Sequence, residues 1–153
     1  NGKDYYFIDQ KEFEQGIEKN YFYEHATIFN NKYGTLKKYV LENLSKKNNV
    51  LLDIDWQGTQ QIKKQIDKKK LITIFILPPS IKILKSRLIN RDQQDKKIAV
   101  ERMKIFKEEL SHWPEYDYVV INNDLQTCYK NIYCLYILTK HIFSYYFWTS
   151  GPI

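Results

Sequence analysis

The chain has 153 residues, of which 43% are hydrophobic and 27% charged. This length and composition are typical of one globular domain with its own core, and they argue against a disordered or fibrous protein. The formal net charge of +6 favours a polyanionic ligand, either a nucleotide or a nucleic acid. Two cysteines, Cys128 and Cys134, match no metal-ligand spacing and indicate no disulfide framework, so we expect a cytoplasmic location.

The first third of the chain is polar and aromatic. Its composition predicts a strand at residues 5–8, a helix at 9–19 that Asp9 caps, and a second strand at 21–29. A turn at residues 30–35 and a helix at 36–44 follow.

Residues 50–54 form an apolar run typical of a strand buried on both faces of a parallel sheet. Asp53 and Asp55 stand where this strand ends, and Gly58 allows a tight turn into the next helix. Ligands of open α/β sheets bind beyond the carboxyl ends of the strands, which makes both acids candidate site residues. The alternative is that one Asp caps the helix and the other is exposed.

The second half of the chain alternates helices and strands. We expect, in order, a helix at 57–66, a strand at 71–77, a helix that Ser80 caps, a charged excursion at 91–97 typical of a mobile flap, a helix at 98–111, a strand at 116–121 and a helix from Asp124. The apolar stretch 132–148 is interpreted as the end of a terminal helix and not as a membrane anchor, because Lys140 and His141 interrupt it. This order predicts an α/β fold with a parallel sheet and right-handed crossovers.

Two clusters could carry chemistry. The first is Tyr5, Glu24, Tyr33 and Thr35, because a carboxylate can accept two N–H bonds from a guanine while hydroxyls bond a phosphate or a base edge. A surface strand with a solvent-facing Glu24 and packing tyrosines explains the same pattern equally well.

The second cluster is Arg87, Arg91 and Arg102, on the helices that flank the charged excursion. Guanidinium groups recognise phosphate bidentately and would suit a phosphoryl transition state. The alternative is a pair of solvated helix faces, although like charges four residues apart would repel there. The run Asn122-Asn123-Asp124 at a strand end could cap the last helix, which we favour, or touch a nucleotide base. Neither GxxxxGK[ST] nor GxGxxG occurs, and the scattered histidines favour neither a metal site nor a triad.

Several motifs in this order resemble the guanylate kinase family of nucleoside monophosphate kinases. They are Asn1-Gly2-Lys3-Asp4-Tyr5, Tyr33-Gly34-Thr35, Leu52-Asp53-Ile54-Asp55-Trp56-Gln57-Gly58, Leu77-Pro78-Pro79-Ser80, Arg87-Leu88 with Arg91, and Tyr116-Asp117-Tyr118-Val119-Val120-Ile121-Asn122. The resemblance runs from the first residue to about Lys140.

The resemblance implies a role for each matching residue. Tyr5 and Tyr33 would hold the GMP phosphate, and the guanine readers would be Glu24, Thr35 and Asp55, with Gly34 keeping the turn tight. Asp53 would face the magnesium–phosphate region, as an outer-shell group for Mg²⁺ that ATP carries. The catalytic phosphate clamp would be Arg87, Arg91 and Arg102, and the ATP contacts would be Arg91 and Asn122.

The implied fold is a P-loop-kinase-like parallel core with a small mixed α/β GMP-binding lobe and a lid. We expect a partial lobe at residues 1–35, a core at 36–142 with its lid near 88–101, and an atypical tail at 143–153. The family's first strand and P-loop would precede Asn1, so we expect a gap or unpaired edge in the sheet. Either this is a fragment, or the gene has changed at its ends.

The implied activity is phosphoryl transfer from MgATP to GMP, giving ADP and GDP. Because the chain lacks a P-loop motif, we expect little or no turnover from these 153 residues alone. The expected partners are GMP and ATP, with no nucleic acid and no membrane. The main alternative is a non-catalytic guanylate-kinase-like module that binds proteins. Nucleic-acid binding through dispersed positive charge is a third hypothesis, for which salt-sensitive binding without guanine preference would be diagnostic.

Overall fold

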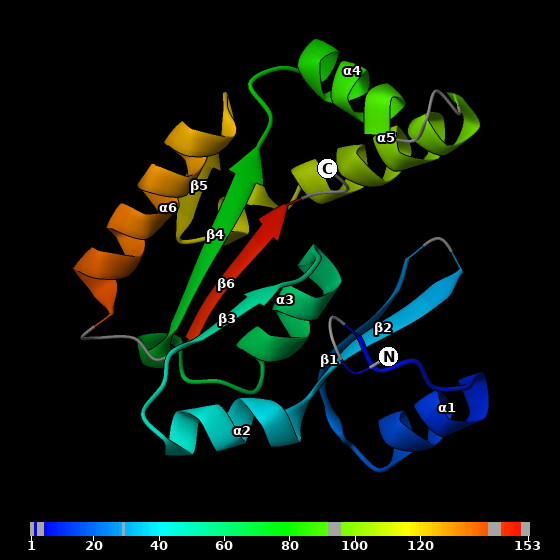
Figure 1. The fold of residues 1–153 in the computed structure, drawn as a ribbon, viewed down its shortest axis with the longest axis vertical. Helices are drawn as coiled ribbons and strands as arrows, with labels where there is room; N and C mark the ends of the chain where they lie inside the picture. Colours follow the sequence, from blue (N-terminus) through cyan, green and yellow to red (C-terminus); the bar gives the residue numbers. More distant parts are fainter. Residues whose placement is uncertain (1, 3–4, 29, 92–95, 141–144, 151–153) are drawn as a thin grey trace.

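The computed structural model describes residues 2, 5–28, 30–91, 96–140 and 145–150. Figure 1 shows a small amino-terminal lobe beside a larger α/β core, with helix α3 lying between the core sheet and the hairpin of the lobe. The predicted α/β class with a parallel sheet is confirmed. No helix in these described ranges has the length and apolar character needed to cross a membrane.

The lobe contains one helix and one antiparallel hairpin, α1 (Gln10–Glu18), β1 (Phe22–Ile28) and β2 (Asn31–Leu36). Asp9 caps α1 as predicted, because its carboxylate accepts a hydrogen bond from the Glu12 amide at 2.7 Å. Two local predictions are wrong. Residues 5–8 form no strand, and most of the expected turn at 30–35 belongs to β2, whose pairing with β1 overrides the turn propensity of its Asn and Gly residues.

The core is a four-stranded parallel sheet with helices around it. Its elements are α2 (Lys37–Ser45), β3 (Val50–Asp53), α3 (Trp56–Lys63), η1 (Lys68–Lys70), β4 (Leu71–Leu77), α4 (Ile81–Arg91), α5 (Lys96–Leu110), η2 (Trp113–Glu115), β5 (Tyr118–Ile121), α6 (Leu125–Thr139) and β6 (Tyr145–Ser150). The strand order is β3-β6-β4-β5, and every neighbouring pair is parallel.

Strand β6 corrects two expectations. The stretch 132–148 does not continue as one helix, because α6 ends at Thr139 and β6 begins at Tyr145. The sheet also has no gap at its centre, because β6 lies between β3 and β4 and pairs with both (Figure 1). Helix propensity in this stretch yields to backbone pairing with two neighbouring strands.

Burial along the sheet is uneven. Six of the seven residues of β4 are buried, and α6 covers one of its faces through Ile72, Ile74 and Ile76, which pack with Cys128. The opposite face meets α3, where Ile62 packs on Leu71.

The prediction that residues 50–54 are buried on both faces is wrong. Strand β3 is at the edge of the described sheet, and Leu51 is 51% exposed. An edge strand has only one strand neighbour, so its surface is covered less completely than that of β4.

Helices α4 and α5 pack against each other through a cluster that includes Leu84, Leu88, Ala99 and Phe106. Together they carry the three arginines of the predicted phosphate clamp. Of the lid expected near residues 88–101, residues 92–95 lie outside the described residues.

Candidate nucleotide-binding site

The hairpin of the lobe brings Glu24 and Thr35 together. They are cross-strand partners, and the Thr35 hydroxyl donates a hydrogen bond of 2.6 Å to Oε1 of Glu24. Glu24 is only 5% exposed, which excludes the alternative of a solvent-facing surface residue. A buried carboxylate without a basic partner is costly, so this acid is placed for a purpose other than solubility.

Asp55 reaches the same place from the core. It caps α3, where its Oδ1 accepts a hydrogen bond of 2.7 Å from the Gly58 amide. Gly58 is buried against both acids. A Cβ at this position would lie 2.7 Å from Oε2 of Glu24 and 3.3 Å from Oδ1 of Asp55. The glycine lies within α3 and not in a turn before it, and it serves the close approach of β1 to the helix.

Burial shapes the charge of this cluster. Burial raises the pKa of Glu24, the hydrogen bond from Thr35 opposes that change, and the charge of Asp55 adds to it. Burial also raises the pKa of Asp55, while backbone N–H groups of Gly58 and Gln57 oppose the change. Two acids that share a largely buried site are suited to a ligand that brings N–H donors, such as the Watson–Crick edge of guanine.

The two candidate phosphate tyrosines meet at the rim of this cluster. The rings of Tyr5 and Tyr33 are 6.0 Å apart between centroids, in an edge-to-face arrangement, and both side chains are exposed. Tyr33 and Thr35 are two residues apart on β2, so their side chains share one face of the hairpin. The five residues expected to hold GMP therefore lie in one region: Tyr5, Glu24, Tyr33, Thr35 and Asp55.

Gly34 has a different role from the one expected. It lies within β2 and not in a turn, and a Cβ there would be 2.8 Å from Cδ1 of Phe22. The register shifts between Phe22 and Glu24, which turns the Phe22 ring to the Gly34 side of the hairpin and leaves Glu24 on the Thr35 side. The glycine makes room for a packed ring beneath the site.

The carboxyl ends of the strands hold the second group of predicted residues. Asp53 is exposed at the end of β3, where it pairs in the backbone register with β6. No group of three His, Cys, Asp or Glu side chains able to hold a metal occurs in the described part of the chain.

Arg87 faces the loop after β5. Its Nη1 donates to the carbonyl oxygen of Asn122 at 2.9 Å, and its Nη2 donates to that of Asn123 at 2.8 Å. The Asn122 amide in turn donates to the Leu77 carbonyl oxygen at 2.7 Å. The structure thus brings Arg87 to the loop that contains Asn122, a contact that the sequence analysis did not predict, and the arginine braces this loop through backbone carbonyl oxygens. Asp124, two residues on, caps α6.

The other two arginines of the predicted phosphate clamp lie on α4 and α5. Arg91 is exposed at the last residue of α4, and Arg102 is half-buried on α5.

Sequence reasoning missed two residues near the acids. Glu109 on α5 is 5% exposed, and burial together with the charges of Asp55 and Glu108 raises its pKa to about 8. Its only sequence signal is its spacing of three from Phe106, on the buried face of a helix. Gln61 on α3 bonds both backbone groups of His25, and no local pattern indicates this contact.

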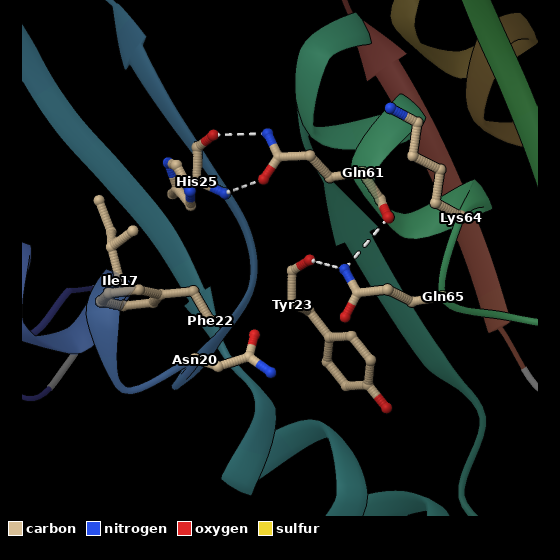
Figure 2. Close-up of a pocket in the computed structure, with 8 residues that line it drawn as sticks. All are labelled: Ile17, Asn20, Phe22, Tyr23, His25, Gln61, Lys64 and Gln65. Carbon is tan, nitrogen blue, oxygen red and sulfur yellow. Dashed lines mark hydrogen bonds between the residues drawn. The ribbon is translucent and has the colours of Figure 1, made fainter.

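A cavity of about 270 Å³ lies on the other side of β1 from Glu24. It is lined by Ile17, Asn20, Phe22, Tyr23, His25, Gln61, Lys64 and Gln65 (Figure 2). None of the predicted site residues lines it, so this hollow is separate from the acid cluster.

Comparison with known proteins shows which family this chain is similar to. The family model described as guanylate kinase matches residues 1–136. The guanylate kinase of Novosphingobium aromaticivorans is 46% identical over 134 residues, which is 86% of this chain and 59% of the relative. The guanylate kinase of Haemophilus influenzae is 46% identical over 132 residues, covering 86% of this chain and 62% of the relative.

A solved structure is also similar to this chain. The crystal structure of guanylate kinase from Anaplasma phagocytophilum matches with a TM-score of 0.71 and 33% sequence identity, covering 92% of this chain and 67% of that chain. The chain spans about six tenths of the length of the curated relatives given above. The match of the family model over most of the chain, together with these relatives, shows that the chain belongs to the guanylate kinase family.

Proposed function

We propose that the protein transfers a phosphoryl group from MgATP to GMP, and that this chain supplies the guanine-reading half of the site. The observation that carries the proposal is the buried Glu24, held by Thr35 at 2.6 Å beside Asp55. A protein-binding module would have no use for two acids facing each other beneath an open tyrosine pair.

In this proposal each residue acts by position and charge. Glu24 accepts from the ring N–H and the exocyclic amine of guanine, Thr35 and Asp55 complete the base contacts, and the hydroxyls of Tyr5 and Tyr33 donate to the GMP phosphate. Orienting an acceptor in this way supplies much of the catalysis that phosphoryl transfer needs.

On the side of the strand ends, Arg87, Arg91 and Arg102 would face the phosphates and Asn122 the ATP base. Mg²⁺ arriving with ATP neutralises phosphate charge when bound, and Asp53 would hold one of its waters. The 153 residues alone are expected to bind GMP with little or no turnover, because they contain no GxxxxGK[ST] motif. Normal turnover in a coupled assay would contradict this expectation.

Calorimetric titration of GMP into the chain tests the proposal, with Glu24→Ala as the variant. A hydrogen bond to a charged group contributes about 1.5–3 kcal/mol. Since Glu24 would make two bonds to the base, we expect the Kd for GMP to rise at least about 100-fold. Glu18→Ala, which removes an exposed acid at the end of α1, is the matched control and should leave the Kd unchanged.

Saturable GMP binding that is lost only in Glu24→Ala supports the proposal. Absence of GMP binding by the folded wild-type chain, or equal binding by both variants, contradicts it and favours the protein-binding alternative.

A further inference from the structure

The free edge of β1 is covered by two glutamine side chains and not by another strand. In the described part of the lobe, β1 pairs with β2 along one edge only. Along the other edge, Nε2 of Gln61 donates to the carbonyl oxygen of His25 at 2.7 Å, and the His25 amide donates to Oε1 of Gln61 at 3.1 Å (Figure 2). One primary amide therefore satisfies both backbone groups of one strand residue.

Gln65, in the turn that follows α3, adds a second contact to the same edge of β1. Its Nε2 donates to the carbonyl oxygen of Tyr23 at 2.6 Å and to that of Gln61 at 3.1 Å. Backbone groups of alternate residues face the same edge of a strand, so Tyr23 and His25 present their carbonyl oxygens to the helix together. The side of α3 thus takes the place of a neighbouring strand, which is one way in which proteins protect sheet edges.

This contact fixes the position of Glu24. Glu24 precedes His25 on β1, and Gly58 precedes Gln61 by one turn on α3. The close approach of the Glu24 carboxylate to Gly58 and the His25–Gln61 bond pair are therefore successive contacts along the same two elements. A slip of β1 along α3 would break the bond pair and move the carboxylate away from Asp55 at the same time.

We propose that Gln61 is a positioning residue for guanine selectivity, which locks β1 onto α3 so that Glu24 faces Asp55 at the spacing that a guanine edge requires. This inference rests on the proposed function, because it assigns a cause to the selectivity of that same site. Gln61 contacts the His25 backbone and acts on the nucleotide only through Glu24.

The chemistry of the contact requires an amide. Glutamine donates and accepts through one planar group, whereas glutamate only accepts and methionine does neither. In Gln61→Glu, a carboxylate would face the His25 carbonyl oxygen and repel it. In Gln61→Met, the helix propensity is similar and the cavity of about 270 Å³ beside the contact has room for the side chain.

The experiment compares Gln61→Met and Gln61→Glu with a matched control, Lys64→Met. Lys64 is an exposed residue of the same helical stretch that lines the same cavity and contributes nothing to the predicted site. Three quantities are measured: the Kd values for GMP and IMP, the melting temperature, and the hydrogen-exchange rate of the His25 amide. IMP lacks the exocyclic amine of GMP, so the ratio of the two Kd values reports whether Glu24 is in register.

We expect both Gln61 variants to weaken GMP binding about 10-fold with a smaller effect on IMP, so that the preference for GMP shrinks. The His25 amide should exchange at least 10-fold faster, because it has lost its partner or its fixed geometry. Lys64→Met should match the wild type in all three measurements. A purely structural role would lower the melting temperature without changing the GMP/IMP ratio.

A folded Gln61→Met variant with the wild-type GMP/IMP ratio would overturn the inference while leaving the proposed function intact. If Gln61→Met does not fold, the same criterion applies to Gln61→Glu, which keeps the acceptor for the His25 amide. If the wild type binds no GMP, the proposed function fails. In that case the His25 amide still tests the contact between Gln61 and β1. Equal exchange rates in wild type and variants would overturn the claim that Gln61 locks β1 onto α3, and faster exchange in the variants would support it.

Discussion

The charge of Asp55 affects the pKa values of two buried acids. It raises the pKa of Glu24 on the lobe side and that of Glu109 on the α5 side, in both cases adding to the effect of burial. Within the described residues, Oε2 of Glu109 is buried and has no hydrogen-bond partner. A carboxyl group in that setting is more stable as the neutral acid. The three acids Glu24, Asp55 and Glu109 together therefore carry one negative charge fewer than their number suggests.

Glu109 should make stability depend on pH. Its pKa is about 8 in the folded protein against 4.5 ordinarily, so between these values the folded state binds more protons than the unfolded state. The free energy of unfolding therefore falls as the pH rises from about 4.5 to about 8.

We expect Glu109→Gln, which stays neutral, to remove most of that fall and to be on the order of 2–3 kcal/mol more stable than wild type near pH 7. Urea unfolding of both proteins across this pH range measures the difference, with exposed Glu108→Gln as the control. Equal pH profiles for Glu109→Gln and wild type would show that Glu109 titrates normally. A smaller slope should remain in the variant, because the pKa values of Glu24 and Asp55 are also raised.

At the scale of elements, α3 connects the parts of the site. Its amino-terminal end is capped by Asp55, and Gln61 on the helix and Gln65 in the turn after it hold β1. On the other side, Gln60 and Lys63 donate to Glu115 of η2. The Trp56 ring also stacks on His112, with centroids 3.9 Å apart. A ligand that contacts Asp55 therefore lies at the beginning of α3, and this helix contacts both the lobe and the residues just after α5.

Among the contacts described above, only the hydrogen bonds of Arg87 link helix α4 to the loop after β5. We expect Arg87→Lys to lower the free energy of unfolding by about 1–2 kcal/mol, because an ammonium group cannot keep the two parallel bonds to the Asn122 and Asn123 carbonyl oxygens. Urea denaturation measures the change. Lys85→Met, at an exposed position of the same helix, should be neutral within about 0.5 kcal/mol. An unchanged free energy of unfolding in Arg87→Lys would show that the two parallel hydrogen bonds are not needed to hold the loop.

At the scale of the whole molecule, the parallel core depends on its last strand. Without β6, β3 would have no strand partner and β4 would lose one of its two, since β6 is the shared neighbour of both. A strand from near the carboxyl-terminal end of the chain thus joins two strands from its middle at the centre of the sheet.

We expect Phe147→Pro to unfold the core cooperatively, with a loss of about 3 kcal/mol or more. Proline lacks the N–H that a central strand donates, and its ring disturbs the register with Leu52 and Thr73. Circular dichroism melting measures the effect. Ile8→Pro, in the exposed extended stretch before α1, is the control and should melt near the wild-type temperature. A Phe147→Pro variant with an unchanged melt would mean that β6 is dispensable.

The sequence predicted those features that are decided by residues close together in the chain. The helix caps Asp9 and Asp124, and Asp55, for which capping was only the alternative, each bond an amide three residues on, so the side chain and its partner are close in the chain. The alternation of helices and strands is equally local, and it was sufficient for the α/β class. The resemblance to the family also implied that Glu24, Thr35 and Asp55 belong to one site.

What needed the tertiary structure is decided by partners distant in sequence. Whether residues 145–150 form a helix or a strand depends on the open backbone edges of β3 and β4, which exist only once those strands are in place. The exposure of β3 follows from its place at the edge of the sheet, and the roles of Glu109 and Gln61 follow from which groups α5 and β1 bring against α3. Hydrogen bonds and burial between remote segments leave no period or spacing in the chain, and so only the folded arrangement of this protein reveals them.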